Sequence, residues 1–97
     1  MDHVQRPVHD LDIGFVRSQF PAFSEPSLEG WAFFENAGGS YACSQVIDRL
    51  TTFYTKTKVQ PYGPYPAAIT AGELMDESYE VMAGLLNVGV DEVHFGP

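Results

Sequence analysis

One cysteine and few basic residues limit what this chain of 97 residues can do. A single thiol, Cys43, cannot form an internal disulfide, and residues 1–10 lack the basic-then-apolar layout of a secretory signal. Five lysines and arginines against thirteen aspartates and glutamates give a formal charge of -8, which repels phosphate backbones and anionic lipid surfaces. We therefore expect a cytoplasmic protein that binds neither nucleic acid nor a membrane.

Long apolar runs are also missing. The longest weakly polar stretch, residues 81–90, contains Asn87 and two glycines, and it is about half of the ~20 residues that a membrane-spanning helix needs. The composition, 44% apolar and 13% aromatic, is nevertheless that of a packed globular protein large enough for one small domain. We expect a flexible leader over residues 1–10, and residues 11–97 belong to at most one domain.

Apolar spacing predicts two helices in the first half of the chain. Residues 11–20 permit a short helix, which Pro21 would end because a proline disfavours helical geometry at the residue before it. Residues 46–54 place their apolar side chains on one face of an amphipathic helix. Ser44 or Ser40 is the natural N-cap of that helix.

A loop and a longer helix are predicted for the second half. Residues 59–66 contain three prolines and a glycine and cannot continue a helix. Thr70 and Glu73 have the spacing of a capping box, which predicts a helix that begins at Thr70 and carries an apolar stripe. Residues 87–89 supply its stop.

Two short strands complete the predicted order. The run Trp31-Ala-Phe-Phe34 lies between Gly30 and the glycines at 38–39, a pattern that is typical of a buried strand. Residues 93–95 predict a second strand. The order of short helix, strand, helix, loop, helix and strand predicts an α/β fold.

The turn after the first expected strand is a candidate anion site. Residues 36–40 read Asn-Ala-Gly-Gly-Ser, and a turn of this kind exposes backbone amides that can hold a carboxylate or a phosphate. The spacing matches neither the dinucleotide-binding fingerprint nor the phosphate-binding loop of nucleotide hydrolases. On spacing alone, a tight turn that needs glycine for its backbone conformation is the favoured explanation.

Other clusters could carry chemistry, and each has a simpler explanation. Cys43 has no histidine near it in the sequence and is more typical of a small buried apolar side chain. His3, His9, Asp10 and Asp12 could be imagined as metal ligands, but a leader would not fix their geometry, and we expect no metal site. Four acidic residues of the last helix are typical of a solvated face: Glu73, Asp76, Glu77 and Glu80.

Lys56 and Lys58 are the only lysines of the chain. Both follow the helix expected over residues 46–54 and stand beside the proline-rich loop. A pyridoxal-phosphate enzyme needs a lysine that binds the cofactor covalently and an acid that holds the pyridine nitrogen. Neither lysine has a predicted acid partner, so we expect no catalytic centre within these 97 residues.

Several segments together resemble a known family. In chain order they are Phe20-Pro-Ala-Phe23, Trp31-Ala-Phe-Phe-Glu-Asn-Ala-Gly-Gly-Ser40, Val46-Ile-Asp48, the acidic helix, and Asp91-Glu-Val-His-Phe-Gly-Pro97. This order resembles the opening of the cysteine desulfurase-like branch of the class V aminotransferases, which are pyridoxal-phosphate enzymes. The resemblance covers roughly residues 12–97.

The resemblance implies the N-terminal part of a fold type I large domain, with residues 11–97 as its arm and incomplete start. Asn36, Ala37 and Gly38 would contact the carboxylate of a small amino-acid substrate. The loop that contains Tyr62-Gly-Pro-Tyr65 would lie near the mouth of the active site. Pyridoxal 5'-phosphate, its lysine and a homodimeric partner would belong to a longer parent enzyme, so this fragment alone would be inactive.

A second interpretation involves no catalysis. The composition also permits a complete small acidic α+β module that binds a partner through its aromatic loop. The ending at Gly96-Pro97, immediately after an expected strand, favours the fragment. Within the family, Ala42-Cys-Ser44 replaces the usual proline before the second helix and the loop has no His-Arg pair. The resemblance therefore leaves desulfurase, aminotransferase and lyase activities open.

Overall fold

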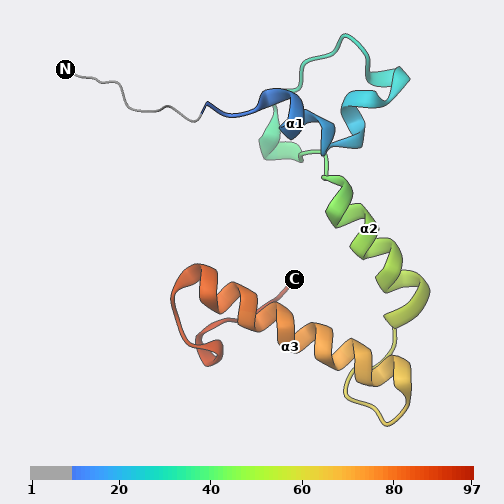
Figure 1. Ribbon diagram of the computed structural model, residues 1–97, viewed down its shortest axis with the longest axis vertical. Coiled ribbons are helices and arrows are strands. Elements are labelled where there is room, and N and C mark those ends of the chain that lie inside the picture. Colours follow the sequence, from blue (N-terminus) through green and yellow to red (C-terminus); the bar gives the residue numbers. More distant parts are fainter. Residues whose placement is uncertain (1–9) are drawn as a thin grey trace, which may run out of the picture. The chain divides into compact units, whose positions relative to one another are not determined.

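The computed structural model describes residues 10–97, and in that part it contains helices and turns but no strand (Figure 1). Its α-helices are α1 (Ile13–Ser18), α2 (Ser44–Thr52) and α3 (Pro66–Leu86). Short 3₁₀ turns lie between and after them: η1 (Pro21–Ser24), η2 (Pro26–Leu28), η3 (Asn36–Gly38) and η5 (Val90–Glu92). A π-helical turn, η4 (Phe53–Thr57), continues α2. The residues group into two compact units, one that ends at Arg49 and one that begins at Leu50.

The predicted α/β fold, with the large-domain strands that it implied, is wrong. Residues 31–34 form irregular chain, with the Trp31 side chain 72% exposed and the Phe34 side chain 89% exposed. Residues 93–95 are also irregular, although the backbone of Val93 is locally extended. A strand needs a neighbour to pair its backbone groups and a layer to cover its apolar face. Residues 10–97 provide neither the pairing strand nor the covering layer, so the aromatic residues at 31–34 do not form a strand.

The first helix confirms the prediction in a shorter form. Asp12 caps α1, because its carboxylate accepts a hydrogen bond of 3.0 Å from the Phe15 N–H. Phe20 is extended and Pro21 begins η1, as expected for a residue that precedes proline. The Arg17 guanidinium lies 4.0 Å above the centre of the Phe23 ring. This stacking connects α1 to the turn that follows it.

The second helix begins at Ser44, and neither predicted serine caps it. The Cys43 carbonyl accepts from the N–H groups of Val46 and Ile47, each at 3.1 Å. The Ser40 hydroxyl instead bonds the Asn36 side chain, and the Ser44 hydroxyl meets the side chain of the next residue. The helical pattern predicted over residues 46–54 is confirmed and continues as a π-helical turn to Thr57.

The third helix is longer than predicted. It begins at Pro66 and not at Thr70, so the capping box at Thr70 does not form. Proline suits the first helical position because its fixed φ is helical and its missing N–H has no partner there. The predicted stop is confirmed: Asn87 is left-handed, with φ 58, and the Val88 N–H returns to the Ala83 carbonyl at 3.0 Å. This 6→1 bond is typical of a Schellman motif.

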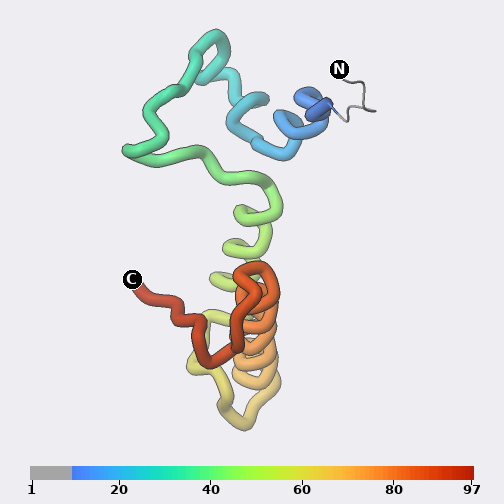
Figure 2. Tube along the Cα trace, turned by 90° about the vertical axis from the view of Figure 1, so that its left-hand side faces the viewer, coloured from blue at the N-terminus to red at the C-terminus, as the bar shows by residue number. Residues whose placement is uncertain are grey.

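The chain turns back after α3. Gly89 and Glu92 close η5, because the Gly89 N–H donates to the Glu92 carboxylate at 2.8 Å. The last residues then run beside the helix (Figure 2). The Phe95 ring meets the Tyr79 ring edge to face, with the ring centroids 4.9 Å apart. Two segments therefore pack on α3: the loop before it and the tail after it.

The buried apolar core is small. Among residues 10–97 it consists of Ala68, Ala71 and Ala83, and no large side chain there is fully buried. The expected leader lies outside the described residues, except for Asp10, which is exposed. In the same part of the chain, no helix combines the length and the apolar character that crossing a membrane requires.

Candidate functional site

The predicted carboxylate site, Asn36, Ala37 and Gly38, forms the single turn η3. The Gly39 N–H donates to the Asn36 carbonyl at 3.1 Å, which closes the turn. Gly39 itself has φ +140, and a Cβ placed there would meet no atom within 4 Å. Backbone conformation and not crowding therefore requires glycine at this position.

The Asn36 side chain is oriented by Ser40. The Ser40 hydroxyl donates to Asn36 Oδ1 at 2.8 Å. Because the carbonyl end of the amide is occupied, its NH₂ end is the one available to donate to a ligand. The serine that was predicted as a helix cap therefore has another role, which is to fix the orientation of a candidate ligand-binding group.

An aromatic pair closes the loop that carries this turn. The rings of Phe33 and Tyr41 meet edge to face, with centroids 5.4 Å apart and planes at 71°. The rings are in the favourable range for such pairs. Residues 34–40 are thus held at both ends, although every one of them is exposed.

One feature of the turn opposes anion binding. The Glu35 side chain lies beside Gly38, where a Cβ would be 3.8 Å from the Glu35 carboxyl carbon. A ligand carboxylate at ~4 Å from the Glu35 carboxylate would be repelled by about 1 kcal/mol in water. The turn supplies neutral donors and no titratable base other than Glu35.

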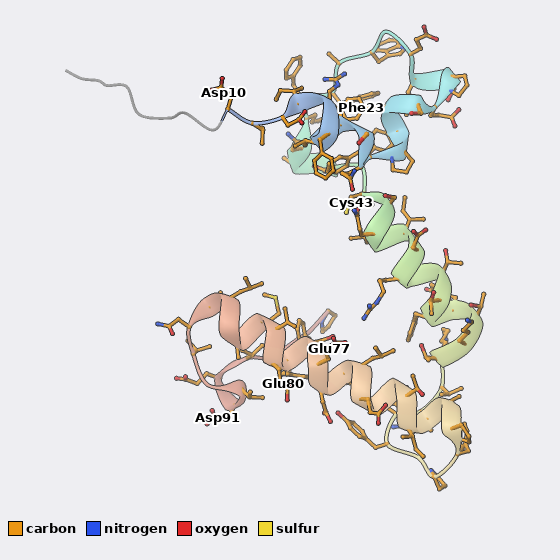
Figure 3. The ribbon with its side chains drawn as sticks, in the orientation of Figure 1. Asp10, Phe23, Cys43, Glu77, Glu80 and Asp91 are labelled. Atoms are coloured by element: carbon orange, nitrogen blue, oxygen red, sulfur yellow. The ribbon has the colours of Figure 1, made fainter. Side chains whose placement is uncertain are left out.

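The other predicted clusters are not assembled into sites. Cys43 is half-buried at the start of α2 (Figure 3), where its carbonyl begins the helix. No group of three or more histidine, cysteine, aspartate or glutamate residues within residues 10–97 could hold a metal ion. His3 and His9 lie outside the described residues. Glu77 and Glu80 are exposed on α3 (Figure 3).

Asp76 binds a tyrosine side chain, a contact that the sequence did not suggest. The Tyr62 hydroxyl donates to Asp76 Oδ1 at 2.7 Å. This hydrogen bond, together with desolvation and the negative charge of Asp76, raises the pKa of the Tyr62 phenol above its usual value. The Tyr62 N–H also donates to the Ala68 carbonyl at 3.1 Å. The possible signal was the four-residue spacing of Ala68, Gly72 and Asp76, which places them on one helical face.

The two lysines do not complete a cofactor site. Lys56 lies within η4 and Lys58 follows it, and both are exposed on either side of the buried Thr57. They belong to the second unit, whereas the turn at Asn36 belongs to the first. A pyridoxal-phosphate site needs its lysine in a pocket with an acid at the pyridine nitrogen. The residues described here do not fit that requirement.

Comparison with known proteins gives one similarity. The chain is 33% identical over 85 residues to "Aminotransferase-like protein FGM3" of Gibberella zeae, a match that covers 84% of this chain and 20% of that protein. The chain therefore spans about a fifth of the length of the curated relative that it matches. No family model matches the chain, and no solved structure matches it. The similarity supports a relation to aminotransferase-like proteins.

Proposed function

We propose that this chain is a ligand-binding segment of a pyridoxal-phosphate-dependent enzyme of the class V aminotransferase type, and that it is not catalytic alone. The observation that carries the proposal is the similarity to an aminotransferase-like protein over 84% of the chain. The match to a fifth of the relative agrees with a chain that supplies one part of a larger active protein. In this proposal the parent enzyme is a homodimer that acts on a small amino acid.

The turn η3 would bind the substrate carboxylate. Asn36 presents its NH₂ group because Ser40 occupies its carbonyl oxygen, and neutral donors of this kind suit a carboxylate. Pyridoxal phosphate, when bound to the parent enzyme, supplies the electron sink for bonds at the α-carbon. The residues described here would contribute substrate binding and orientation only.

The experiment is a titration of the isotope-labelled 97-residue chain with acetate, followed by NMR. We expect saturable shifts of the Asn36 side-chain NH₂ and the Gly38 amide. Asn36→Asp keeps the shape and can still accept from Ser40, but it replaces the donor with a negative charge and should abolish the shift of the Gly38 amide. Equal acetate binding by wild type and by Asn36→Asp would contradict the proposed role of the turn.

Glu35→Gln is the matched variant, and it should change acetate binding in the opposite direction. Because the Glu35 carboxylate lies beside Gly38, its neutralisation should strengthen acetate binding, by about fivefold at most for a like charge at ~4 Å in water. Binding that weakens in Glu35→Gln would mean that Glu35 supports the site. An interaction module without catalysis remains the second candidate, although the absence of strands from residues 10–97 excludes an α+β form of it.

A further inference from the structure

Tyr62 has an unusual backbone conformation. Its φ is 65, and the only other positive φ outside glycine among the described residues is at Asn87, where α3 ends. Asparagine adopts this left-handed region readily, whereas a bulky residue such as tyrosine rarely does. The surrounding contacts must therefore hold Tyr62 in place.

These contacts all lie on one face of α3. The Tyr62 N–H bonds the Ala68 carbonyl, and the hydroxyl bonds Asp76 Oδ1. Between them the ring crosses Gly72, where an added Cβ would lie 2.7 Å from Cδ1 of Tyr62. Ala68, Gly72 and Asp76 are four residues apart and form one ridge of the helix. The tyrosine is thus fixed at its backbone, its ring and its hydroxyl.

The loop that carries Tyr62 is closed tightly at a conformational cost. A Cβ on Gly63 would lie 2.9 Å from the Ala68 Cβ, so the loop backbone touches the helix. Just before the loop, the Thr57 hydroxyl is buried without a hydrogen-bond partner among residues 10–97. The left-handed tyrosine disfavours the closed loop. Opening the loop would relieve the backbone strain and let water reach residues that it covers.

We propose that Tyr62 and Asp76 form a latch that holds the loop of residues 58–65 closed on α3, and that the loop opens when their hydrogen bond breaks. In the closed state the chain presents Tyr65, which is exposed. In the open state it presents the small-residue ridge at Ala68 and Gly72, which is buried when the loop is closed. The latch therefore controls exposure of this ridge, whether or not η3 binds a carboxylate.

Hydrogen exchange of the Tyr62 amide measures the latch directly, because this N–H bonds α3 only when the loop is closed. The experiment uses the full 97-residue chain at neutral pH and follows the Tyr62 and Tyr79 amides by NMR. In Tyr62→Phe, the Tyr62-position amide should exchange roughly two- to tenfold faster, as expected for loss of a solvent-exposed hydrogen bond. The Tyr79 amide, in the middle of α3, should keep its wild-type rate.

Asp76→Ala and the double variant complete the test. Each single variant should accelerate exchange by a similar factor, and the double variant should exchange no faster than either, because both remove the same bond. Glu80→Gln is the control, since it removes another carboxylate of α3 and should leave the Tyr62 amide unchanged. Independent, additive effects of the two substitutions would overturn the latch. So would equal acceleration of the Tyr62 and Tyr79 amides, which would indicate that the whole helix is destabilised.

Discussion

Gly72→Ala tests the closed loop because the substitution has two opposing effects on the free energy of unfolding. Alanine in place of glycine inside a helix stabilises the folded state by about 1 kcal/mol, because glycine loses more conformational freedom than alanine when the chain folds. At Gly72, however, the new Cβ would lie 2.7 Å from Cδ1, 3.0 Å from Cε1 and 3.1 Å from the backbone nitrogen of Tyr62. The ring could rotate away, but the backbone nitrogen can move only with the loop.

The magnitude follows from these distances. Ordinary contact with a Cβ begins at 3.4 Å, so Cδ1 of the ring must move by about 0.7 Å and the loop backbone nitrogen by about 0.3 Å. Overpacking of this kind costs about 1–3 kcal/mol. After subtraction of the helix gain, we expect Gly72→Ala to lower the free energy of unfolding by about 0–2 kcal/mol. Thermal or urea denaturation of the full chain, followed by helical circular dichroism, measures this quantity.

Gly84→Ala is the matched control. It lies in the same helix, and a Cβ there meets no atom within 4 Å. Only the helix gain remains, so Gly84→Ala should raise stability by about 0.5–1 kcal/mol. The two variants should therefore differ by about 1–3 kcal/mol. If Gly72→Ala stabilises as much as Gly84→Ala, the Tyr62 ring does not lie on Gly72 and the account of the loop is refuted.

Three further results are expected. Thr57→Val should stabilise by about 1 kcal/mol in urea denaturation, because it removes a buried hydroxyl that has no partner among residues 10–97; a loss of stability would show that the hydroxyl is satisfied. Asn87→Ala should destabilise by about 1 kcal/mol, because alanine resists the left-handed φ of 58 that ends α3, whereas Asn87→Gly should cost nothing measurable. The raised pKa of Tyr62 favours the neutral phenol in the folded state, so its contribution to stability is complete below the ordinary value of 10.0 and is lost as the pH rises through the folded pKa. A pH series of wild type against Tyr62→Phe should converge in that range, and parallel curves would contradict the Tyr62 to Asp76 bond.

Local sequence patterns predicted which segments are helical better than they predicted the residues at which the helices begin. Apolar spacing identified α1, α2 and α3, and Asn87 correctly marked the end of α3. The start of α3 was missed because Pro66, taken as part of a loop, is the first residue of the helix. Proline ends a helix only when it stands inside one, and at the first position it is compatible with helical geometry.

Features that depend on distant partners were not predictable from the sequence. The aromatic run at Trp31 has the composition of a strand, but strand formation depends on a neighbouring strand that the described residues do not provide. The contacts of Tyr62 with Gly72 and Asp76 join residues ten and fourteen positions apart. The four-residue spacing of Gly72 and Asp76 marks one helical face, but it does not show that Tyr62 lies on that face. The turn at Asn36 was located correctly as a turn, but the hydrogen bond from Ser40 that orients it was not foreseen.

The visible absorption spectrum tests the proposed relation to a pyridoxal-phosphate enzyme most directly. The protein translated from the complete reading frame that contains these residues would be purified with pyridoxal phosphate and dialysed. We predict a cofactor band that survives dialysis and changes when an amino acid is added, with a weaker response in Asn36→Asp but an unchanged band before the addition. A folded product that retains no pyridoxal phosphate would contradict the account.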